Sequence, residues 1–252
     1  MRKRALPFGA AAIVAASCAS PPDRGVPVDG GASPDTGPNG EPVTLIAEDF
    51  EGLEGEYEAG DAMGDWTILR AVGTAVVTRA ADEGIPPRRG DSLFRFSEFS
   101  DDPGFSESRI DQCVAFDPDR PMSFRYDVYA DIDGDFVTND LRIRVNPNFY
   151  TDIDACRDDV SADSTSNRLE EIGAWYNEDW DVRLENAGAE PRAWFHADRA
   201  TDNAPAPDLR LEPEHYPQGA SAVRLSVRVR DDIYTANPSR RLYLDDIRLT
   251  QP

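Results

Sequence analysis

The sequence predicts an all-β domain, a β-sandwich or jelly roll, because short alternating segments recur along most of its 252 residues. The clearest segment is VRLSVRVR, residues 223–230, in which four apolar residues alternate with Arg, Ser, Arg and Arg. This strict period-two alternation predicts a strand with one face on a core and the other in water. Turns rich in Gly, Pro and Asp separate the segments, and the sequence holds no convincing long helix.

The strands are predicted in chain order from their β-type residues and the turns that bound them. In LRIRV, residues 141–145, three apolar residues point inward while Arg142 and Arg144 point outward. Residues 151–213 are the least regular part and predict long loops with one or two strands, with SNRLEEIGAWY at 166–176 as a candidate short helix. The predicted strand segments are 43–50, 73–79, 92–97, 109–116, 122–130, 141–145, 223–230 and 242–249.

The first 18 residues predict an export signal. A charged start precedes an apolar run from Ala5 to Ala16, which is well under the ~20 residues of a membrane-spanning helix. The run leads into AASC, which resembles the lipobox of bacterial lipoproteins, although Ala15 stands where that motif usually has Leu. The resemblance implies an exported protein, lipid-anchored in the cell envelope at Cys18, and sorted to the outer membrane because Ala19 follows. Ordinary cleaved secretion is the alternative.

Residues 19–42 are rich in Pro, Gly, Ser and Asp and show no apolar periodicity. Such a composition cannot build a core, so it predicts a disordered tether. A single folded domain is then expected over residues 43–252, a length that is ordinary for an all-β sandwich.

The chain is strongly acidic, with 26 basic and 48 acidic residues and a net charge of −22. Nucleic-acid binding needs a basic surface, so the composition predicts no nucleic-acid partner. It also predicts no docking on an anionic membrane surface, which leaves the lipid as the membrane contact. Lys3 is the single lysine, so the domain's basic residues are all Arg. Codon bias in a GC-rich genome and adaptation to high salt both explain this.

Cys113 and Cys156 are the cysteines that remain after Cys18. An exported protein matures in an oxidising compartment, so a disulfide between them is expected. Closing this loop contributes roughly 4 kcal/mol in the chain-entropy model.

A set of motifs in order gives a family resemblance. They are EDFEG at 48–52, Trp66, GDSLFRF at 90–96, PQGASAVRLSVRV at 217–229 and LYLDDIRL at 242–249. Together they resemble jelly-roll carbohydrate-binding modules of the cellulose- and xylan-binding type, within the galactose-binding-like superfamily. The resemblance implies a jelly-roll β-sandwich of two antiparallel sheets, a polysaccharide or glycan partner and a structural calcium ion.

The same resemblance implies where calcium would bind. Calcium takes six to eight oxygen ligands from carboxylates and carbonyls. The family's pattern points to Glu51, Asp245 and the backbone around Arg88 to Asp91, with Asp49 as a spare ligand. Asp246 would then face solvent or pair with an arginine. Two solvated acids at a strand end are the alternative.

Aromatic residues in the irregular region predict a sugar platform, because sugars stack their C–H faces on aromatic rings. The candidates are Trp175, Tyr176 and Trp180, with Asn177, Glu178 and Asp179 as polar partners. Trp66 and Trp194 are expected in the core. The alternative is that all four tryptophans pack inside.

No catalytic signature is present: the sequence lacks G-x-S-x-G, H-E-x-x-H and a phosphate loop. His196 and His215 show no local partner pattern. A glycosidase needs only two carboxylates, which the abundance of acids neither excludes nor identifies. The prediction is therefore a non-catalytic carbohydrate-binding module. The alternative is a structural or protein-binding envelope domain of the same fold.

Overall fold

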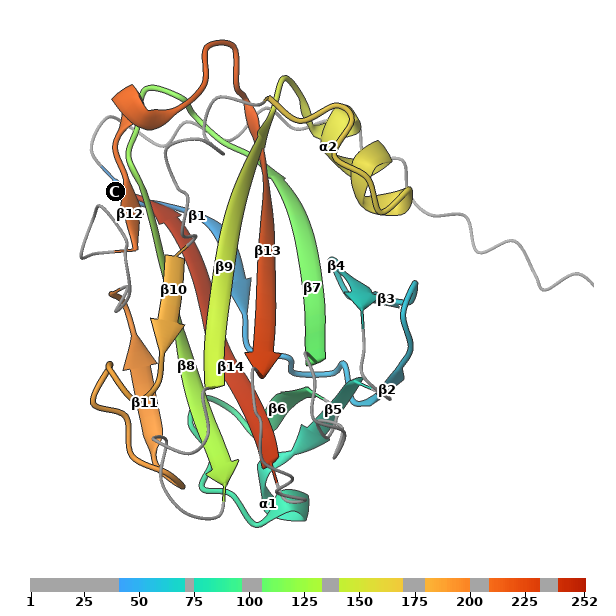
Figure 1. The fold of residues 1–252 in the computed structure, drawn as a ribbon, viewed down its shortest axis with the longest axis vertical. Coiled ribbons are helices and arrows are strands. Elements are labelled where there is room, and N and C mark those ends of the chain that lie inside the picture. Colours follow the sequence, from blue (N-terminus) through green and yellow to red (C-terminus); the bar gives the residue numbers. More distant parts are fainter. Residues whose placement is uncertain are drawn as a thin grey trace, which may run out of the picture. The chain divides into compact units, whose positions relative to one another are not determined.

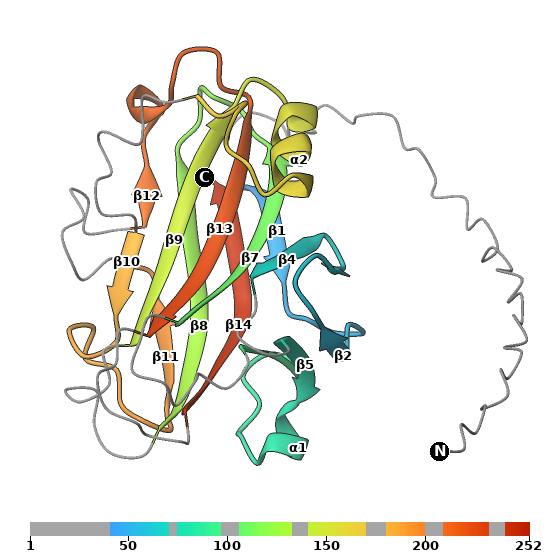
Figure 2. The same ribbon diagram turned by 45° about the vertical axis from the view of Figure 1, so that its right-hand side comes forward.

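The computed structural model describes residues 41–70, 75–96, 106–132, 141–169, 180–199, 209–231 and 240–252. These residues form a jelly-roll β-sandwich of two antiparallel sheets, which confirms the predicted fold class. Of the strands with ten or more residues, Ser106–Ala115, Leu141–Tyr150 and Ala222–Asp231 lie in one sheet, and Met122–Ile132 and Arg240–Gln251 lie in the other (Figure 1 and Figure 2). No helix among the described residues is long and apolar enough to cross a membrane.

One sheet, here called the β8–β14 sheet, has the strand order β11-β8-β14-β6-β5-β2, with β1 on β14 and β12 on β8. Its strands are β1 (Val43–Glu48), β2 (Gly55–Tyr57), β5 (Ala75–Arg79), β6 (Ser92–Phe96), β8 (Met122–Ile132), β11 (Trp194–Ala197), β12 (Arg210–Leu211) and β14 (Arg240–Gln251). The opening strand β1 pairs with the closing strand β14 from Val43↔Gln251 to Glu48↔Ile247.

The other sheet, the β9–β13 sheet, has the order β10-β9-β13-β7-β4-β3. Its strands are β3 (Ala62–Met63), β4 (Trp66–Arg70), β7 (Ser106–Ala115), β9 (Leu141–Tyr150), β10 (Trp180–Arg183) and β13 (Ala222–Asp231). β13 lies between β9 and β7 and pairs with both over its whole length. Three helical segments are also described: α1 (Ala80–Glu83), α2 (Ile153–Ser161) and the 3-10 turn η1 (Pro213–His215).

The core lies between the sheets and contains the apolar residues that the alternation in the sequence predicted to point inward. Phe124, Tyr126 and Val128 of β8 are buried there, and Arg125 on the opposite face is exposed. Trp66 is fully buried, as expected. Each predicted strand segment overlaps an observed strand.

Trp194 corrects one expectation, because it does not join this core. It lies half-buried on the outer face of the β8–β14 sheet, where its ring packs on Tyr129 at 5.5 Å between centroids. Its indole N–H donates to the Pro86 carbonyl at 2.7 Å. The tryptophan therefore holds the segment after α1 against the sheet.

Helix α2 is a second correction, because residues 151–213 were expected to hold their helix at 166–176. The helix begins at Ile153, after Asp152 accepts a hydrogen bond from the Ala155 N–H at 2.8 Å. An aspartate at this N-cap position satisfies an otherwise unpaired amide. Residues 166–169 are not helical, and 170–176 lie outside the described residues.

The predicted disulfide is present between Cys113 of β7 and Cys156 of α2, with a Cα–Cα distance of 6.1 Å. Cys156 is fully buried and packs with Tyr150 and Ala222. The bond therefore joins α2 to the β9–β13 sheet.

Replacing both cysteines by serine should lower the free energy of unfolding by about 4 kcal/mol, since the 43-residue loop is then open in the unfolded state. Urea unfolding of the oxidised protein and of Cys113→Ser/Cys156→Ser measures the difference. A reductant should weaken the wild type by the same amount and leave the variant unchanged. Equal stability of the two proteins would contradict the expectation.

Candidate ligand-binding face

The outer face of the β9–β13 sheet carries charged and polar side chains aligned across its strands. Ile143, Val145 and Val227 point into the core, so alternate positions point outward. We call the outward positions of β4, β7, β9, β10 and β13 the arginine face. From β9 through β13 to β7, its rows are Asn148–Arg224–Cys113, Asn146–Ser226–Asp111, Arg144–Arg228–Arg109 and Arg142–Arg230–Glu107.

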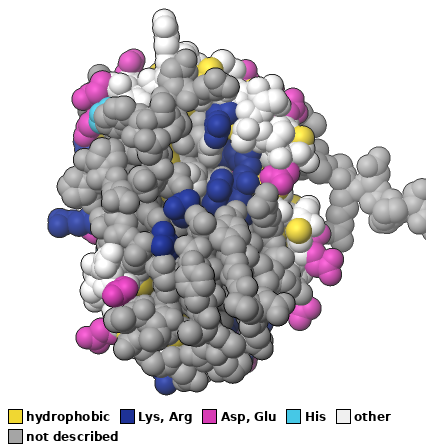
Figure 3. Space-filling view, viewed as in Figure 1, with side chains coloured by type: hydrophobic (Ala, Val, Ile, Leu, Met, Phe, Trp, Pro, Cys, Tyr) yellow, Lys and Arg dark blue, Asp and Glu magenta, His cyan; other side chains and the backbone are white. Residues whose placement is uncertain are grey.

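Three arginines stand directly opposite one another across neighbouring strands. Arg228 of β13 pairs with Arg144 of β9 on one side and Arg109 of β7 on the other. Figure 3 shows basic side chains gathered in this part of the molecule, over β9 and β13. In the same register, Asp181 of β10 stands opposite Arg144 on its other side, and Asp111 lies in the neighbouring row.

Asp111 is the buried counter-charge of this face, with no exposed surface. It accepts hydrogen bonds from Arg109 Nε at 2.8 Å and Arg109 Nη2 at 2.6 Å, and a further bond from Arg224 Nε. Burial raises the pKa of the Asp111 carboxyl, while the Arg109 guanidinium lowers it. Two guanidinium groups thus share one carboxylate.

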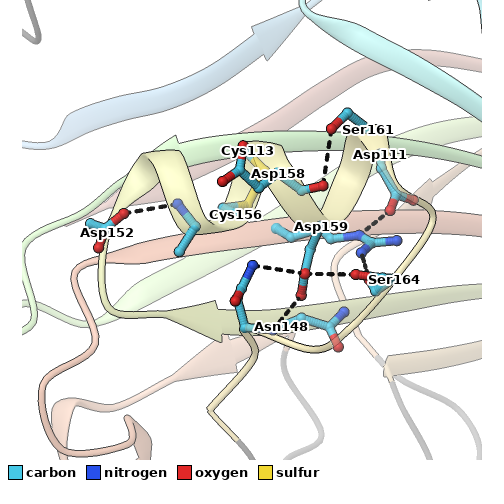
Figure 4. The surroundings of a disulfide bond; sticks show 12 residues. Asp111, Cys113, Asn148, Asp152, Cys156, Asp158, Asp159, Ser161 and Ser164 are labelled. Atoms are coloured by element: carbon cyan, nitrogen blue, oxygen red, sulfur yellow. Dashed lines mark hydrogen bonds and ion pairs between the residues drawn. A yellow bond between two sulfur atoms is a disulfide. The ribbon is translucent and has the colours of Figure 1, made fainter.

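Helix α2 and the segment after it cover the end of the face that holds Arg224 (Figure 4). Arg224 Nη1 donates to the Ser164 carbonyl at 2.8 Å, and Arg168 Nη1 donates to Asn148 Oδ1 at 2.9 Å. Asp159 organises this cover by accepting from Ser164, Ser166 and the Asn167 amide. Arg224 is therefore held both by Asp111 of its own sheet and by the segment that follows α2.

The buried polar atoms of the arginine face that have no hydrogen-bond partner among the described residues include a pair on neighbouring rows, Arg224 Nη2 and Asn146 Oδ1. Buried polar atoms are nearly always hydrogen-bonded, and exceptions need an explanation. One is a donor and the other an acceptor, on neighbouring rows of the same face. A polar ligand with hydroxyl or carboxylate groups would satisfy both.

A hollow of about 650 Å³ borders the arginine face between α2, β4 and β7. Its polar lining includes Thr67, Asp111, Gln112, Arg157 and Ser161. Gln112 Oε1 is a further buried acceptor without a partner among the described residues. Since Asp111 belongs to both, the hollow and the arginine face are continuous.

The segments expected to bind calcium do meet, at the turn before β6. Glu51 Oε1 accepts from the Asp91 N–H at 2.6 Å and the Ser92 N–H at 2.8 Å. Asp245 Oδ2 accepts from the Arg89 N–H at 2.8 Å. Gly90 has a φ of +68°, and a Cβ atom there would overlap Glu51 Oε1, so the turn requires glycine.

These contacts test the fit of a calcium ion. Carboxylates and turn carbonyls are the donor set that calcium prefers, and Glu51 and Asp245 reach one turn. The oxygens described above are held by N–H donors, while Asp49 Oδ1 lies 3.4 Å from the Glu51 N–H. Among the described residues, no group of three or more His, Cys, Asp or Glu is placed to hold a metal. The donors fit calcium in kind, and calcium stays a prediction.

Asp245 and Asp246 are both buried, although they are neighbours in a strand, because β14 bulges there. The register with β8 shifts between Asp245 and Arg248, and Asp246 has a φ of +46°. Asp246 accepts from Arg89 at 2.9 Å and Arg248 at 2.6 Å, which confirms the expected arginine pairing. Asp245 is fully buried, and burial raises its pKa to about 7.

Sequence reasoning missed an acid–histidine cluster beside Asp245. Asp127 pairs with Asp245 across β8 and β14 and with His196 across β8 and β11. Its carboxylate lies 2.7 Å from His196 Nδ1 and accepts from Arg88 Nε at 2.8 Å. This pairing uses the Arg88 side chain, whereas the calcium expectation concerns the backbone around Arg88 and stays a prediction. No Ser, Thr or Cys in the described part of the chain hydrogen-bonds to His196.

The predicted sugar platform is not described. Trp175, Tyr176, Asn177, Glu178 and Asp179 lie outside the described residues. Trp180 begins β10, where its backbone pairs with Val145, and its side chain is also outside the described set. The platform therefore remains a prediction. The arginine face was missed because alternation places Arg outward but does not give the register between strands.

Comparison with known proteins gives similarity of fold. No family model matches the chain, and no curated protein matches it. The solved structures it resembles include carbohydrate-binding modules, the class that the sequence motifs resemble. A family 61 module in complex with β-1,4-galactotriose has 11% identity and a TM-score of 0.43, over 81% of this chain and 94% of that one.

Two further structures belong to this class. The tandem family 22 modules of a Paenibacillus barcinonensis protein show 13% identity and a TM-score of 0.43, over 83% of this chain and 50% of theirs. A family 27 module studied for mannan recognition shows 12% identity and a TM-score of 0.39, over 84% and 99%. At such identities and scores the similarity assigns no ligand to this chain.

Asp111→Asn should destabilise the protein by about 3–5 kcal/mol, because it leaves Arg109 and Arg224 as buried cations without their counter-ion. Asp163→Asn is the matched control. Its side chain is 47% exposed and lies 3.5 Å from Arg109, so its loss should cost less than about 1 kcal/mol. Urea unfolding of both variants gives the comparison. Similar small losses would show that the buried pairing is not needed for stability.

Proposed function

We propose that the protein is a non-catalytic carbohydrate-binding module whose arginine face contacts the glycan. The observation that carries this proposal is the pair of buried, unpartnered polar atoms, Arg224 Nη2 and Asn146 Oδ1, on an aligned polar sheet face. Sugar hydroxyls donate and accept hydrogen bonds at once, so they can satisfy a neighbouring donor and acceptor together. An apolar protein partner would leave both atoms buried without hydrogen bonds.

Chain order supports the same location for the aromatic platform. Trp175 and Tyr176 precede β10 by a few residues, and β10 is the strand at the edge of the arginine face, where it pairs with β9. Aromatic rings supplied from this segment would stack on sugar rings while the sheet holds the hydroxyls. Asn177, Glu178 and Trp180 belong to this proposed contact set.

A binding role without catalysis fits the placement of two neighbouring carboxylates. Asp127 and Asp245 face each other across β8 and β14, but they are 4% and 0% exposed. A glycosidase requires its two carboxylates to flank a bound sugar linkage. Both carboxylates are engaged by groups of the chain itself, Asp127 by Arg88 and His196 and Asp245 by the Arg89 N–H, so we do not propose them as a catalytic pair.

We further propose that the module is exported and lipid-anchored in the cell envelope through Cys18, with residues 19–42 as its tether. A flexible tether would let the domain sample glycan at a distance from the membrane.

Binding to a broad glycan panel tests the main proposal. The purified protein should bind a specific glycan, and Asn146→Ala should weaken that binding about tenfold, since one hydrogen bond at a desolvated site contributes on the order of 1–1.5 kcal/mol. Trp175→Ala should weaken it similarly if the platform is real. Thr44→Ala, an exposed polar change on β1, is the control and should bind normally. Failure of a folded sample to bind any glycan would instead favour a structural or protein-binding envelope domain.

We also propose calcium at the turn that joins Glu51 and Asp245. Two features support it: an oxygen-rich meeting of the first and last strands, and a buried Asp245 carboxyl near Asp246 and Asp127, whose negative charges a cation would offset. N–H donors alone are the competing account of how these carboxylates are held.

Melting curves separate the two accounts. If calcium binds, a chelator should lower the melting temperature by several degrees, and added calcium should restore it while magnesium does not, because magnesium demands a smaller octahedral site. Asp245→Ala should abolish the chelator effect. An identical melting temperature with and without chelator would favour the N–H donors and remove calcium from the proposal.

A further inference from the structure

We propose that the hollow between α2, β4 and β7 binds one neutral sugar residue, the end unit of the glycan that the arginine face contacts. This inference rests on the proposed glycan-binding function and adds a second contact site to it. It derives from the position of Gln112, the elements that surround the hollow and the mixed character of the lining.

Gln112 is a polar side chain at a core-facing position of β7. It shares its side of the strand with Ile110, which is buried in the core, and with Val114, which packs against the core. Gln112 is 9% exposed, and its Oε1 atom has no hydrogen-bond partner among the described residues. A buried acceptor of this kind destabilises a fold unless it is satisfied. A ligand hydroxyl in the hollow would supply the missing donor.

The backbone of β7 supplies further hydrogen-bonding groups to the hollow. The Phe116 N–H donates to the Ser221 carbonyl at 3.0 Å, so the even-numbered residues of β7 direct their backbone groups toward β13. Cys113 therefore directs its N–H and carbonyl to the other edge of the strand. On that edge β4 pairs with β7 only as far as Asp111, and Cys113 lines the hollow beyond it.

The hollow is bounded by four elements of the chain. β7 lies along its floor, α2 and β4 line its sides, and Leu45 of β1 lines it from the other sheet. The bond between Cys113 and Cys156 holds α2 in this position (Figure 4). Asp111 joins the hollow to the arginine face. A glycan that enters from that face would therefore end in the hollow.

The size and apolar surface of the hollow suit a sugar ring. Its volume of about 650 Å³ lies within the range of small-molecule sites, roughly 300–1,000 Å³. The apolar lining consists of Leu45, Leu69, Val114 and Val160, all half-buried or buried. A sugar has C–H faces that pack on such side chains and hydroxyl groups that bond to the polar ones.

The charges around the hollow favour a neutral ligand over an anion. The charged lining residues are Asp65, Asp111 and Arg157, and Asp111 is already bound by arginines of the sheet. Helix α2 adds the exposed acids Asp154 and Asp158. Hydroxyl groups both donate and accept, so a neutral sugar can bond to the Gln112 amide and to the backbone of β7 together.

Polymer length tests the binding of an end unit. Soluble galactan, mannan, xylan and β-glucan are each offered to the intact protein before and after partial hydrolysis, which makes more chain ends from the same mass of sugar. For a polymer that binds, calorimetry should give a number of sites per gram that rises in proportion to the chain ends. An unchanged number of sites per gram would overturn the proposal, because binding along the chain needs no end.

Two variants locate the contact. Gln112→Leu continues the apolar series of β7 and removes the unsatisfied acceptor. It should lower the affinity about tenfold, the effect of one hydrogen bond at a desolvated site, while the melting temperature stays the same or rises. Thr67→Val removes a lining hydroxyl at nearly constant shape and should also lower the affinity. Gln218→Leu is the matched control at an exposed position outside the lining, and its affinity should not change.

The outcomes separate this inference from the proposed function. Normal affinity in Gln112→Leu and Thr67→Val, with a loss in Asn146→Ala, would keep glycan binding and overturn the site in the hollow. A lower melting temperature of Gln112→Leu would also overturn it, because the amide would then be satisfied without a sugar. If a folded sample binds none of the four polymers, the inference fails, and the broad glycan panel decides the proposed function separately.

Discussion

The position of β13 between β9 and β7 is the constraint on which the rest of the structure depends. Its ten residues, Ala222–Asp231, pair with both neighbours without a register shift. This register sends the apolar half of VRLSVRVR into the core and lines up the polar half with the outward residues of two other strands. It also sets Cys113 beside Arg224, at the end of the sheet where Cys156 of α2 arrives. A slip of one residue would turn every side chain of β13 to the opposite face.

The buried charges under α2 are stabilised by ion pairs and hydrogen bonds with one another and not by contact with solvent. Arg224 and Asp111 are both almost completely buried, and burying either one alone would cost several kcal/mol in general. The disulfide, the Asp152 cap and the Asp159 hydrogen bonds each hold a different part of α2 and its following segment in place. That cover keeps water from Arg224, and hydrogen bonds in such a low-dielectric site are electrostatically stronger than in water.

Sequence patterns predicted the parts of this structure that depend on local alternation and on covalent chemistry. The strands containing residues 122–130 and 223–230, and the Cys113–Cys156 bond, are of this kind. The meeting of Glu51, Asp245 and the turn at Gly90 was predicted through the family resemblance. Helix α2 was not predicted, because DIDACRDDVS is polar and depends on a cap, a disulfide and tertiary contacts. Strand β9 was predicted only to Val145, because Pro147 has no N–H to donate to a neighbouring strand. In the structure β9 continues past Pro147, and its pairing with β10 ends at Val145, before the proline. The alignment of arginines is a property of strand pairs, which no single segment encodes.

The buried acidic residues on the two outer faces of the sandwich have different hydrogen-bond partners, and this difference bears on function. On the β8–β14 sheet, the segment after α1 lies over the face: Trp194 binds Pro86, and Arg88 and Arg89 reach Asp127, Asp245 and Asp246. The acids of that face are bound by groups of the chain itself, which suits a structural joint between β14 and the turn before β6. On the β9–β13 sheet, one buried acid is shared by two arginines, and donor and acceptor atoms remain without partners among the described residues. A joint leaves few unsatisfied atoms, whereas a binding face holds its hydrogen-bonding groups in place before the ligand arrives. These unpartnered atoms on the second face are what supports its proposed role in binding.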